Sequence, residues 1–207
     1  MSIAVGVIDM GTSNLASVLR GLQAAGLEPT LLRRPWVDGA FGRVVLPGVG
    51  TFKAGMEALT RMGLIDPIRR HVQAGRPLLG ICLGAQLLME RGTEFGDHAG
   101  LGLIPGTVLR LPETPGRRIP HVGWSAIEPD APWDETLLSS LAAGAFVYFT
   151  HSFACVPDAP SHRLAHFTFG PHRAAAAVAV GSATGLQFHP ELSSRTGLDI
   201  LRRLGQF

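Results

Sequence analysis

One cysteine of this chain stands where a nucleophile is expected. The segment Gly80-Ile81-Cys82-Leu83-Gly84 follows an apolar run and precedes a helical pattern. This is the G-x-nucleophile-x-G spacing of a nucleophile elbow, with Cys in place of Ser. Glycines on both sides avoid Cβ clashes at such a sharp turn. A helix that begins after Cys82 favours the thiolate, which is the reactive form. Taken alone, the segment fits a buried structural cysteine equally well.

A base for this nucleophile is present near the other end of the chain, in Gln187-Phe188-His189-Pro190-Glu191. His189 has the chemistry to take the thiol proton and return it to a leaving group. Residues two apart in an extended backbone point to the same side. We therefore expect Glu191 to reach the second ring nitrogen of His189 and fix its tautomer. Because the chain has 8 histidines, an exposed His-Pro-Glu turn is the alternative.

The first half of the chain predicts a scaffold that brings these residues together. Short apolar runs alternate with amphipathic stretches, which predicts a parallel sheet with helices on both faces. We expect strands at 3–8, 43–46 and 77–82, and helices at 14–25, 54–62, 66–73 and 83–91. Cys82 and His189 both fall at strand ends, where the sites of open α/β sheets form.

The second half predicts shorter strands separated by Gly, Pro and His, which we expect to extend the same sheet. These strands are at 106–111, 124–128, 145–151, 164–169, 174–179 and 186–189, followed by a helix at 197–204. The predicted fold class is α/β, with an open mixed, mostly parallel sheet. Since no repeat or linker divides the sequence, residues 1–207 are expected to form a single domain.

The composition excludes several classes of function. The chain has 18 basic and 16 acidic residues and a net charge of +2, which favours neither a nucleic-acid nor a membrane partner. Its apolar runs are too short to span a bilayer, and the first residues lack the features of a signal peptide. Two cysteines do not make a disulfide framework, so the cytoplasm is the expected location.

The two motifs taken together resemble a known family. Gly-Ile-Cys-Leu-Gly-Ala-Gln at 80–86 and Gln-Phe-His-Pro-Glu at 187–191 are similar to the motifs of the triad-type, class I glutamine amidotransferases, whose architecture is flavodoxin-like. The resemblance implies a glutaminase in which Cys82, His189 and Glu191 form the catalytic triad. The glutamine-binding residues that it implies are Gly50, Gln86, His151, Ser152 and Phe153.

Other segments resemble one branch of that family, the glutaminase subunits of imidazole glycerol phosphate synthase in histidine biosynthesis. They are Leu46-Pro47-Gly48-Val49-Gly50, Ile119-Pro120-His121-Val122-Gly123-Trp124 and Tyr148-Phe149-Thr150-His151-Ser152-Phe153. In the first of these, glycines flanking Val49 let its peptide rotate. The backbone N–H groups of Val49 and Leu83 would then form an oxyanion hole.

This resemblance also implies a partner. Ammonia released from glutamine would pass to a (β/α)8-barrel cyclase subunit, with Asn14, Trp124 and Tyr148 at the interface of the heterodimer. Neither a metal nor an organic cofactor is implied. Four residues depart from the pattern of this branch, where Tyr, Gly, Asn and Lys are usual: Met10, Ser13, Ser125 and Leu192.

Three other interpretations compete with this one. The glutaminase subunit of pyridoxal phosphate synthase or of anthranilate synthase fits less well, because of the Pro-Gly-Val-Gly turn and the Pro-His-Val-Gly-Trp segment. A non-catalytic interaction subunit would not need Cys82, His189 and Glu191. A cysteine peptidase or esterase on a related scaffold would not need Gln86 and the His-Pro-Glu order.

Overall fold

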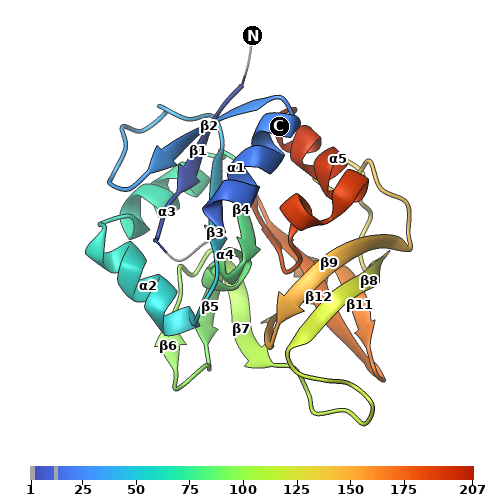
Figure 1. Ribbon diagram of the computed structural model, residues 1–207. Coiled ribbons are helices and arrows are strands. Elements are labelled where there is room, and N and C mark those ends of the chain that lie inside the picture. Colours follow the sequence, from blue (N-terminus) through green and yellow to red (C-terminus); the bar gives the residue numbers. More distant parts are fainter. Residues whose placement is uncertain (1–2, 12–13) are drawn as a thin grey trace.

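The computed structural model describes residues 3–11 and 14–207 (Figure 1). The helices are α1 Leu15–Ala24, α2 Phe52–Arg61, α3 Ile65–Gln73, α4 Leu83–Leu87 and α5 Ser194–Leu204, with short 3-10 turns η1 Pro160–His162 and η2 Pro190–Leu192. The strands are β1 Ile3–Ile8, β2 Leu27–Leu32, β3 Val44–Gly48, β4 Leu78–Cys82, β5 Met89–Gly92, β6 His98–Ala99, β7 Ile104–Arg110, β8 His121–Pro129, β9 Ala145–His151, β10 Phe153–Pro157, β11 Arg163–Phe169, β12 His172–Val180 and β13 Ala183–Leu186.

The strands of the described residues form two sheets. The larger has nine strands in the order β2-β1-β3-β4-β13-β12-β11-β8-β9, and the smaller has four in the order β10-β7-β5-β6. In the larger sheet, β2 to β13 pair in parallel, and β13 to β9 pair antiparallel. The predicted α/β class with a mixed sheet is confirmed, and its parallel part is the half that carries Cys82.

Helices cover both faces of the parallel half, as expected (Figure 1). Adjacent residues of a strand point to opposite faces. Val45 packs in the core beneath α1 and α5, with Leu22 and Ile200. Its neighbour Leu46 packs in the core beneath α2 and α4, with Phe52. Burying both faces fixes the register of β3, and with it the position of the turn that follows.

The expected helix at 83–91 is wrong in its second half. Helix α4 ends at Leu87, and Met89–Gly92 is strand β5, which pairs with β6 and β7. Local pattern favoured a helix, but tertiary packing overrides it here. A Cβ at Gly92 would lie 2.6 Å from the Phe52 ring, so only a glycine lets β5 pass beneath α2.

The expectation of a single sheet is also wrong, and two larger strands were not predicted. Strand β7 and the unpredicted β10 leave the main sheet and pair with each other in the four-stranded sheet. Strand β2, also unpredicted, contains Pro29. It lies at the edge of the larger sheet, where a strand tolerates a missing N–H. The last expected strand, 186–189, is placed wrongly: β13 spans Ala183–Leu186, three residues earlier in the chain.

Candidate active site

Cys82 is the last residue of β4 and immediately precedes α4. Its φ is +55°, a left-handed conformation that costs a non-glycine residue energy and is often found at functional sites. Its side chain is 7% exposed and reaches a cavity at the carboxyl edge of the parallel strands. The strained turn therefore aims the thiol out of the sheet, as the elbow motif predicts.

The two glycines of the elbow are required by close packing. A Cβ at Gly84 would lie 1.7 Å from the carbonyl oxygen of Leu46, and a Cβ at Gly80 would lie 2.7 Å from the backbone of Gly84 and Ala85. No side-chain rearrangement relieves a clash with backbone. These glycines bring α4 against β3 and β4, and so set the direction in which Cys82 points.

His189 lies beside Cys82 and is paired with Glu191. Nδ1 of His189 is 2.8 Å from Oε1 of Glu191, and both side chains are buried. Nε2 of His189 is buried and has no hydrogen-bond partner in the described part of the chain. Burial lowers the pKa of His189, but Cys82 and Glu191 outweigh burial and raise the pKa to about 10. A protonated imidazole at this place stabilises a neighbouring thiolate.

The predicted contact between His189 and Glu191 is present, but an extended strand does not make it. His189 is extended, and Glu191 lies in the 3-10 turn η2 that follows. Ser193, which the sequence did not single out, holds this turn in place. Its hydroxyl donates to the carbonyl of His189 at 2.6 Å and accepts from the N–H of Tyr148 at 3.0 Å. The N–H of His189 donates to the carbonyl of Tyr148 at 2.9 Å.

The cavity beside Cys82 has a volume of ≈ 300 Å³, at the small end of the range for ligand sites. It brings together Cys82 and the residues expected from the sequence to form the oxyanion hole and to bind glutamine. Glu94 and Thr150 also line it, whereas His189 and Glu191 are not among its lining residues. The complete lining is Val49, Gly50, Cys82, Leu83, Gln86, Glu94, Thr150, His151, Ser152 and Phe153.

The side chain of Gln86 stabilises the wall of this cavity by donating two hydrogen bonds. Its Nε2 donates to the carbonyl of Phe153 at 2.9 Å and to Oε1 of Gln187 at 3.1 Å. Both amide hydrogens are therefore used within the protein. Gln187 in turn has its Nε2 3.9 Å from Sγ of Cys82. Gln86 thus links α4, β10 and the segment before His189.

His151 is buried against the same carbonyl. Its Nδ1–H donates to the oxygen of Phe153 at 2.8 Å, and its Nε2 is buried with no partner among the described residues. Burial lowers the pKa of His151 to about 3, so the ring is neutral and its Nε2 is an acceptor. The rings of His121 and Phe149 pack against it.

The turn after β3 forms the opposite wall of the cavity. Val49 is exposed, and Gly50 has a φ of +106° with open space where a Cβ would be. A side chain at Gly50 would be strained in this conformation. Leu83, on the other side, is the first residue of α4, so its N–H has no partner within the helix. Both backbone segments border the space in front of Cys82.

The three interface candidates lie in exposed or half-buried positions. Trp124 on β8 is 49% exposed and faces Tyr148 on β9 across the strand pair, with ring centroids 5.9 Å apart. Asn14 is exposed and directly precedes α1. Val122 and Phe146 are exposed apolar residues of the same two strands. An apolar surface of this kind is typical of a protein contact.

The residues that depart from the branch pattern have different surroundings. Met10 is buried, and its Cε lies 2.8 Å from where a Cβ at Gly48 would be. The Ser125 hydroxyl is 3.1 Å from Nε2 of His121. Leu192 is exposed. Ser13 lies outside the described residues.

Two further features concern the part of the chain that the structure describes. No group of three or more His, Cys, Asp or Glu in it is arranged to hold a metal ion, and none of its helices could span a bilayer.

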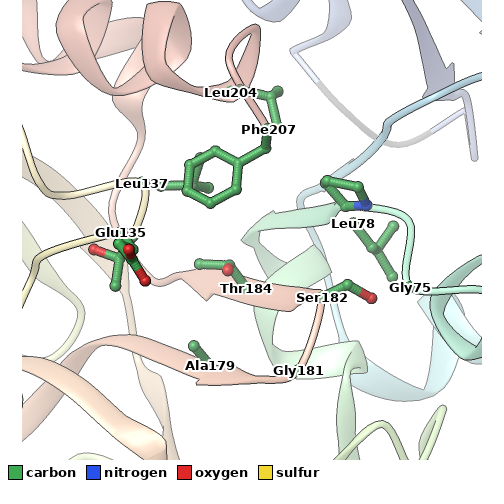
Figure 2. A pocket seen from close by; sticks show the side chains of 12 residues that line it. Gly75, Leu78, Glu135, Leu137, Ala179, Gly181, Ser182, Thr184, Leu204 and Phe207 are labelled. Carbon is green, nitrogen blue, oxygen red and sulfur yellow. The ribbon is translucent and has the colours of Figure 1, made fainter.

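A separate cavity of ≈ 380 Å³ lies at the opposite end of β4 and β13, bordered by Leu78, Thr184 and Phe207 (Figure 2). None of its described lining residues is a cysteine or a histidine, so it is separate from the site of Cys82.

Comparisons with known proteins agree with this architecture. The model of the family "Glutamine amidotransferase class-I" matches residues 6–204. A solved structure titled "Crystal structure of glutamine amidotransferase" has a TM-score of 0.73 at 21% identity, covering 98% of this chain and 99% of that chain. A second, "Structure of PurLQS from Thermotoga maritima", has a TM-score of 0.76 at 18% identity, covering 99% and 98%. At these identities the structures show the fold alone.

Curated relatives are more similar in sequence. Imidazole glycerol phosphate synthase subunit HisH 1 of Legionella pneumophila (strain Lens) is 38% identical, covering 98% of this chain and 99% of the relative. Subunit HisH of Gloeobacter violaceus is 43% identical, covering 96% and 87%. The chain therefore belongs to the class-I glutamine amidotransferase family and, within it, to the HisH subunits of imidazole glycerol phosphate synthase.

Proposed function

We propose that this amidotransferase subunit hydrolyses glutamine to glutamate and ammonia, with Cys82, His189 and Glu191 as its catalytic triad. One observation carries the proposal: the buried 2.8 Å contact between Glu191 and Nδ1 of His189, which leaves Nε2 for Cys82 and the substrate. A carboxylate on one ring nitrogen and a nucleophile at the other is the arrangement that activates a thiol.

The reaction proceeds in two steps. The Cys82 thiolate attacks the side-chain carbonyl carbon of glutamine and forms a tetrahedral intermediate. When the intermediate collapses, the C–N bond breaks, His189 gives its proton to the leaving nitrogen, and ammonia departs from a γ-glutamyl thioester. His189 then takes a proton from water, which attacks the thioester. Glutamate leaves, and the Cys82 thiolate and the protonated His189 are restored.

The oxyanion of each intermediate is held by the backbone N–H groups of Val49 and Leu83. Leu83 supplies a donor that its helix does not use, and Val49 lies across the cavity from it. A single oxyanion donor contributes about 2.7–4 kcal/mol, or roughly a hundred- to a thousandfold in rate. Rotation of the Val49 peptide, which Gly48 and Gly50 permit, therefore gives the partner a means of switching hydrolysis on.

Glutamine occupies the cavity beside Cys82. The end of the glutamine that lies away from the reacting side-chain amide is held by Gly50 and by the segment His151, Ser152 and Phe153. Gln86 contributes by holding the carbonyl of Phe153, which supports the cavity wall. The neutral ring of His151 supplies an acceptor to the same wall. These roles are supported by the hydrogen bonds that both side chains donate to the Phe153 carbonyl.

The ammonia passes to a (β/α)8-barrel cyclase subunit, which uses it to make imidazole glycerol phosphate in histidine biosynthesis. Ammonia in neutral water is mostly ammonium and not nucleophilic, so a dry path between the subunits is needed. The partner covers the exposed apolar side chains of β8 and β9, with Trp124 and Tyr148 in the contact and Asn14 near it. The names of the curated relatives support a multi-subunit synthase.

In this proposal residues 1–207 are one domain that acts in the cytoplasm, where the two free cysteines stay reduced. The chemistry needs only thiol, imidazole, carboxylate and water, so no cofactor takes part. Glutamine hydrolysis for a different synthase is the second candidate. It predicts the same triad with another partner.

The test is glutamine hydrolysis by the subunit alone, by its complex with the cyclase, and by the complex with the cyclase nucleotide bound. We expect a low rate for the first and a much higher rate for the last. Cys82→Ser should abolish glutamine-dependent synthesis but leave ammonia-dependent cyclase activity. A glutamine-analogue electrophile should label Cys82 and not Cys155, whose thiol pKa burial raises to about 12. Equal rates in all three states would contradict switching by the partner, and labelling of Cys155 in place of Cys82 would contradict the assignment of the nucleophile.

A further inference from the structure

A second cavity lies behind the wall that carries Phe153. Its volume is ≈ 340 Å³, and it is enclosed between the paired strands β7 and β10 on one side and β11 and β12 on the other. In Figure 1, β7 is labelled below the centre of the view and β12 lies to the right of it. The residues that define its chemistry are Arg110, Leu111, Ala154, Arg163, His172 and Arg173.

The rim of this cavity is basic. It carries three arginines and a histidine, and none of its described lining residues is acidic. Arg163 is fixed by Asp130, with Nε and Nη2 at 2.8 and 3.2 Å from the carboxylate oxygens. Arg173 is 68% exposed and only within 4.0 Å of Asp130. Arg110 makes a long contact of 3.5 Å with exposed Glu113. Arg110 and Arg173 therefore keep donors for a ligand.

The floor of the cavity is apolar. Leu111, Ala154, Cys155 and Ala175 line it and are each at most 5% exposed. The side chains of Ala154 and Ala175 are small, so this floor leaves room for an apolar group. A site with an apolar floor and a few convergent charged groups is the usual form of a small-molecule site. Guanidinium groups are suited to carboxylates and phosphates, which they bind through paired N–H donors.

This cavity shares its wall with the site of Cys82. Arg110 pairs with Phe153 across β7 and β10, and the N–H of Leu111 donates to the carbonyl of Ser152 at 2.8 Å. The carbonyl of Phe153 accepts from both Gln86 and His151. A ligand that shifts Arg110 or Leu111 therefore also shifts the backbone of Ser152 and Phe153. Gln86 and His151, which line the cavity of Cys82, are hydrogen-bonded to that backbone.

We propose that this second cavity binds a small organic anion, with a carboxylate or phosphate head group on an apolar body, and that its occupancy changes the affinity of the Cys82 cavity for glutamine. Arg110 and Arg173 hold the head group, and the floor around Ala154 holds the body. The binding half stands independently of the proposed glutaminase activity, whereas the coupling half rests on it.

The cavity of Figure 2 provides an internal contrast. It is also largely apolar, but Glu135 is its charged lining residue and none of its described lining residues is a cation. An anion should therefore avoid it. A neutral apolar molecule has no reason to discriminate between the two cavities, so the basic rim can be tested separately from the apolar floor.

Binding is measured by NMR titration of the ¹⁵N-labelled full chain with phenyl phosphate, benzoate and, as a neutral control, benzyl alcohol. Either anion should shift the amide signals of Leu111 and Ala154, and the tighter one identifies the head group. Arg173→Glu and Arg173→Ala should weaken binding roughly tenfold or more, since a hydrogen bond to a charged group is lost. Arg34→Glu makes the same charge change at an exposed position elsewhere and should have no effect.

Absence of these shifts, shifts at Ser182 and Thr184 instead, or equal weakening by Arg34→Glu would overturn the binding site. For the coupling, the KM for glutamine is measured in the assembled synthase with and without phenyl phosphate. A change of KM in the wild type and Arg34→Glu, but not in Arg173→Glu, is expected. An unchanged KM, or the same change in Arg173→Glu, would overturn the coupling. No glutamine turnover by any complex would instead count against the proposed function.

Discussion

We predict that Glu191→Gln slows glutamine hydrolysis in the assembled synthase roughly ten- to hundredfold. In the structure a carboxylate oxygen lies 2.8 Å from Nδ1 of His189, and the two side chains are 2% and 6% exposed. A hydrogen bond to a charged group contributes about 1.5–3 kcal/mol, and about 1.4 kcal/mol corresponds to a factor of ten. The amide keeps the shape of the carboxylate and removes its charge.

The buried surroundings of Glu191 add a second effect. Its other oxygen, Oε2, is buried and has no partner in the described residues. In Glu191→Gln, the NH2 group of the new side chain must therefore either remain without a hydrogen-bond acceptor there or face Nδ1 of His189. The first costs about 1–3 kcal/mol of stability, and the second favours the wrong tautomer of His189. Because Glu191 helps to raise the pKa of His189, its loss should also move the alkaline limb of the pH–rate profile to lower pH.

The assay is the steady-state release of glutamate from pH 6 to pH 10, at a temperature well below the unfolding midpoint of the variant. Ammonia-dependent cyclase activity reports whether the complex is intact and should not change. Glu28→Gln, the same substitution at an exposed position of β2, is the matched control. Turnover within twofold of the wild type, with an unmoved pH profile, would show that Glu191 does not orient His189.

Three further predictions concern the nucleophile elbow, the buried His151 and the surface that binds the partner. Gly84→Ala should destabilise the fold by about 3 kcal/mol or more, because its Cβ would lie 1.7 Å from the carbonyl oxygen of Leu46. Gly42→Ala, with open space around its Cβ, is the control, and equal denaturation midpoints would contradict the prediction. Since burial lowers the pKa of His151 from 6.5 to about 3, its contribution to stability is present above pH 6.5 and lost as the pH falls toward 3. From pH 7 to pH 5 the wild type should therefore lose about 2 kcal/mol more unfolding free energy than His151→Asn, and parallel losses in urea titrations would refute this. Trp124→Ala should weaken binding of the cyclase subunit by about 2 kcal/mol or more, and an unchanged Kd by calorimetry would place the interface elsewhere.

The main candidates of the site could be named from the order of amino acids, whereas Glu94, Thr150 and Ser193 could not. Few residue types can act as nucleophile, base and orienting acid, so residue type and spacing made Cys82, His189 and Glu191 candidates. The resemblance of the two motifs to those of the amidotransferases joined them into one predicted triad. The elbow could be predicted because its glycines have a local cause: Gly84 packs directly on the backbone of the preceding strand. The short apolar runs of the first half likewise predicted the parallel strands β1, β3 and β4, since most of their residues are buried on both faces. The more exposed parallel strand β2 was missed.

Features that depend on contacts between distant segments could not be predicted in this way. Local pattern favoured a longer helix after Cys82, but pairing with β7 turns Met89–Gly92 into a strand. The sheet to which β10 belongs could not be predicted from its apolar residues either, because it is decided by the pairing of β10 with β7. The roles of Gln86 and His151 follow from one shared acceptor, the carbonyl of Phe153. Backbone carbonyls carry no sequence signal, so only the folded chain shows which side chains meet at one.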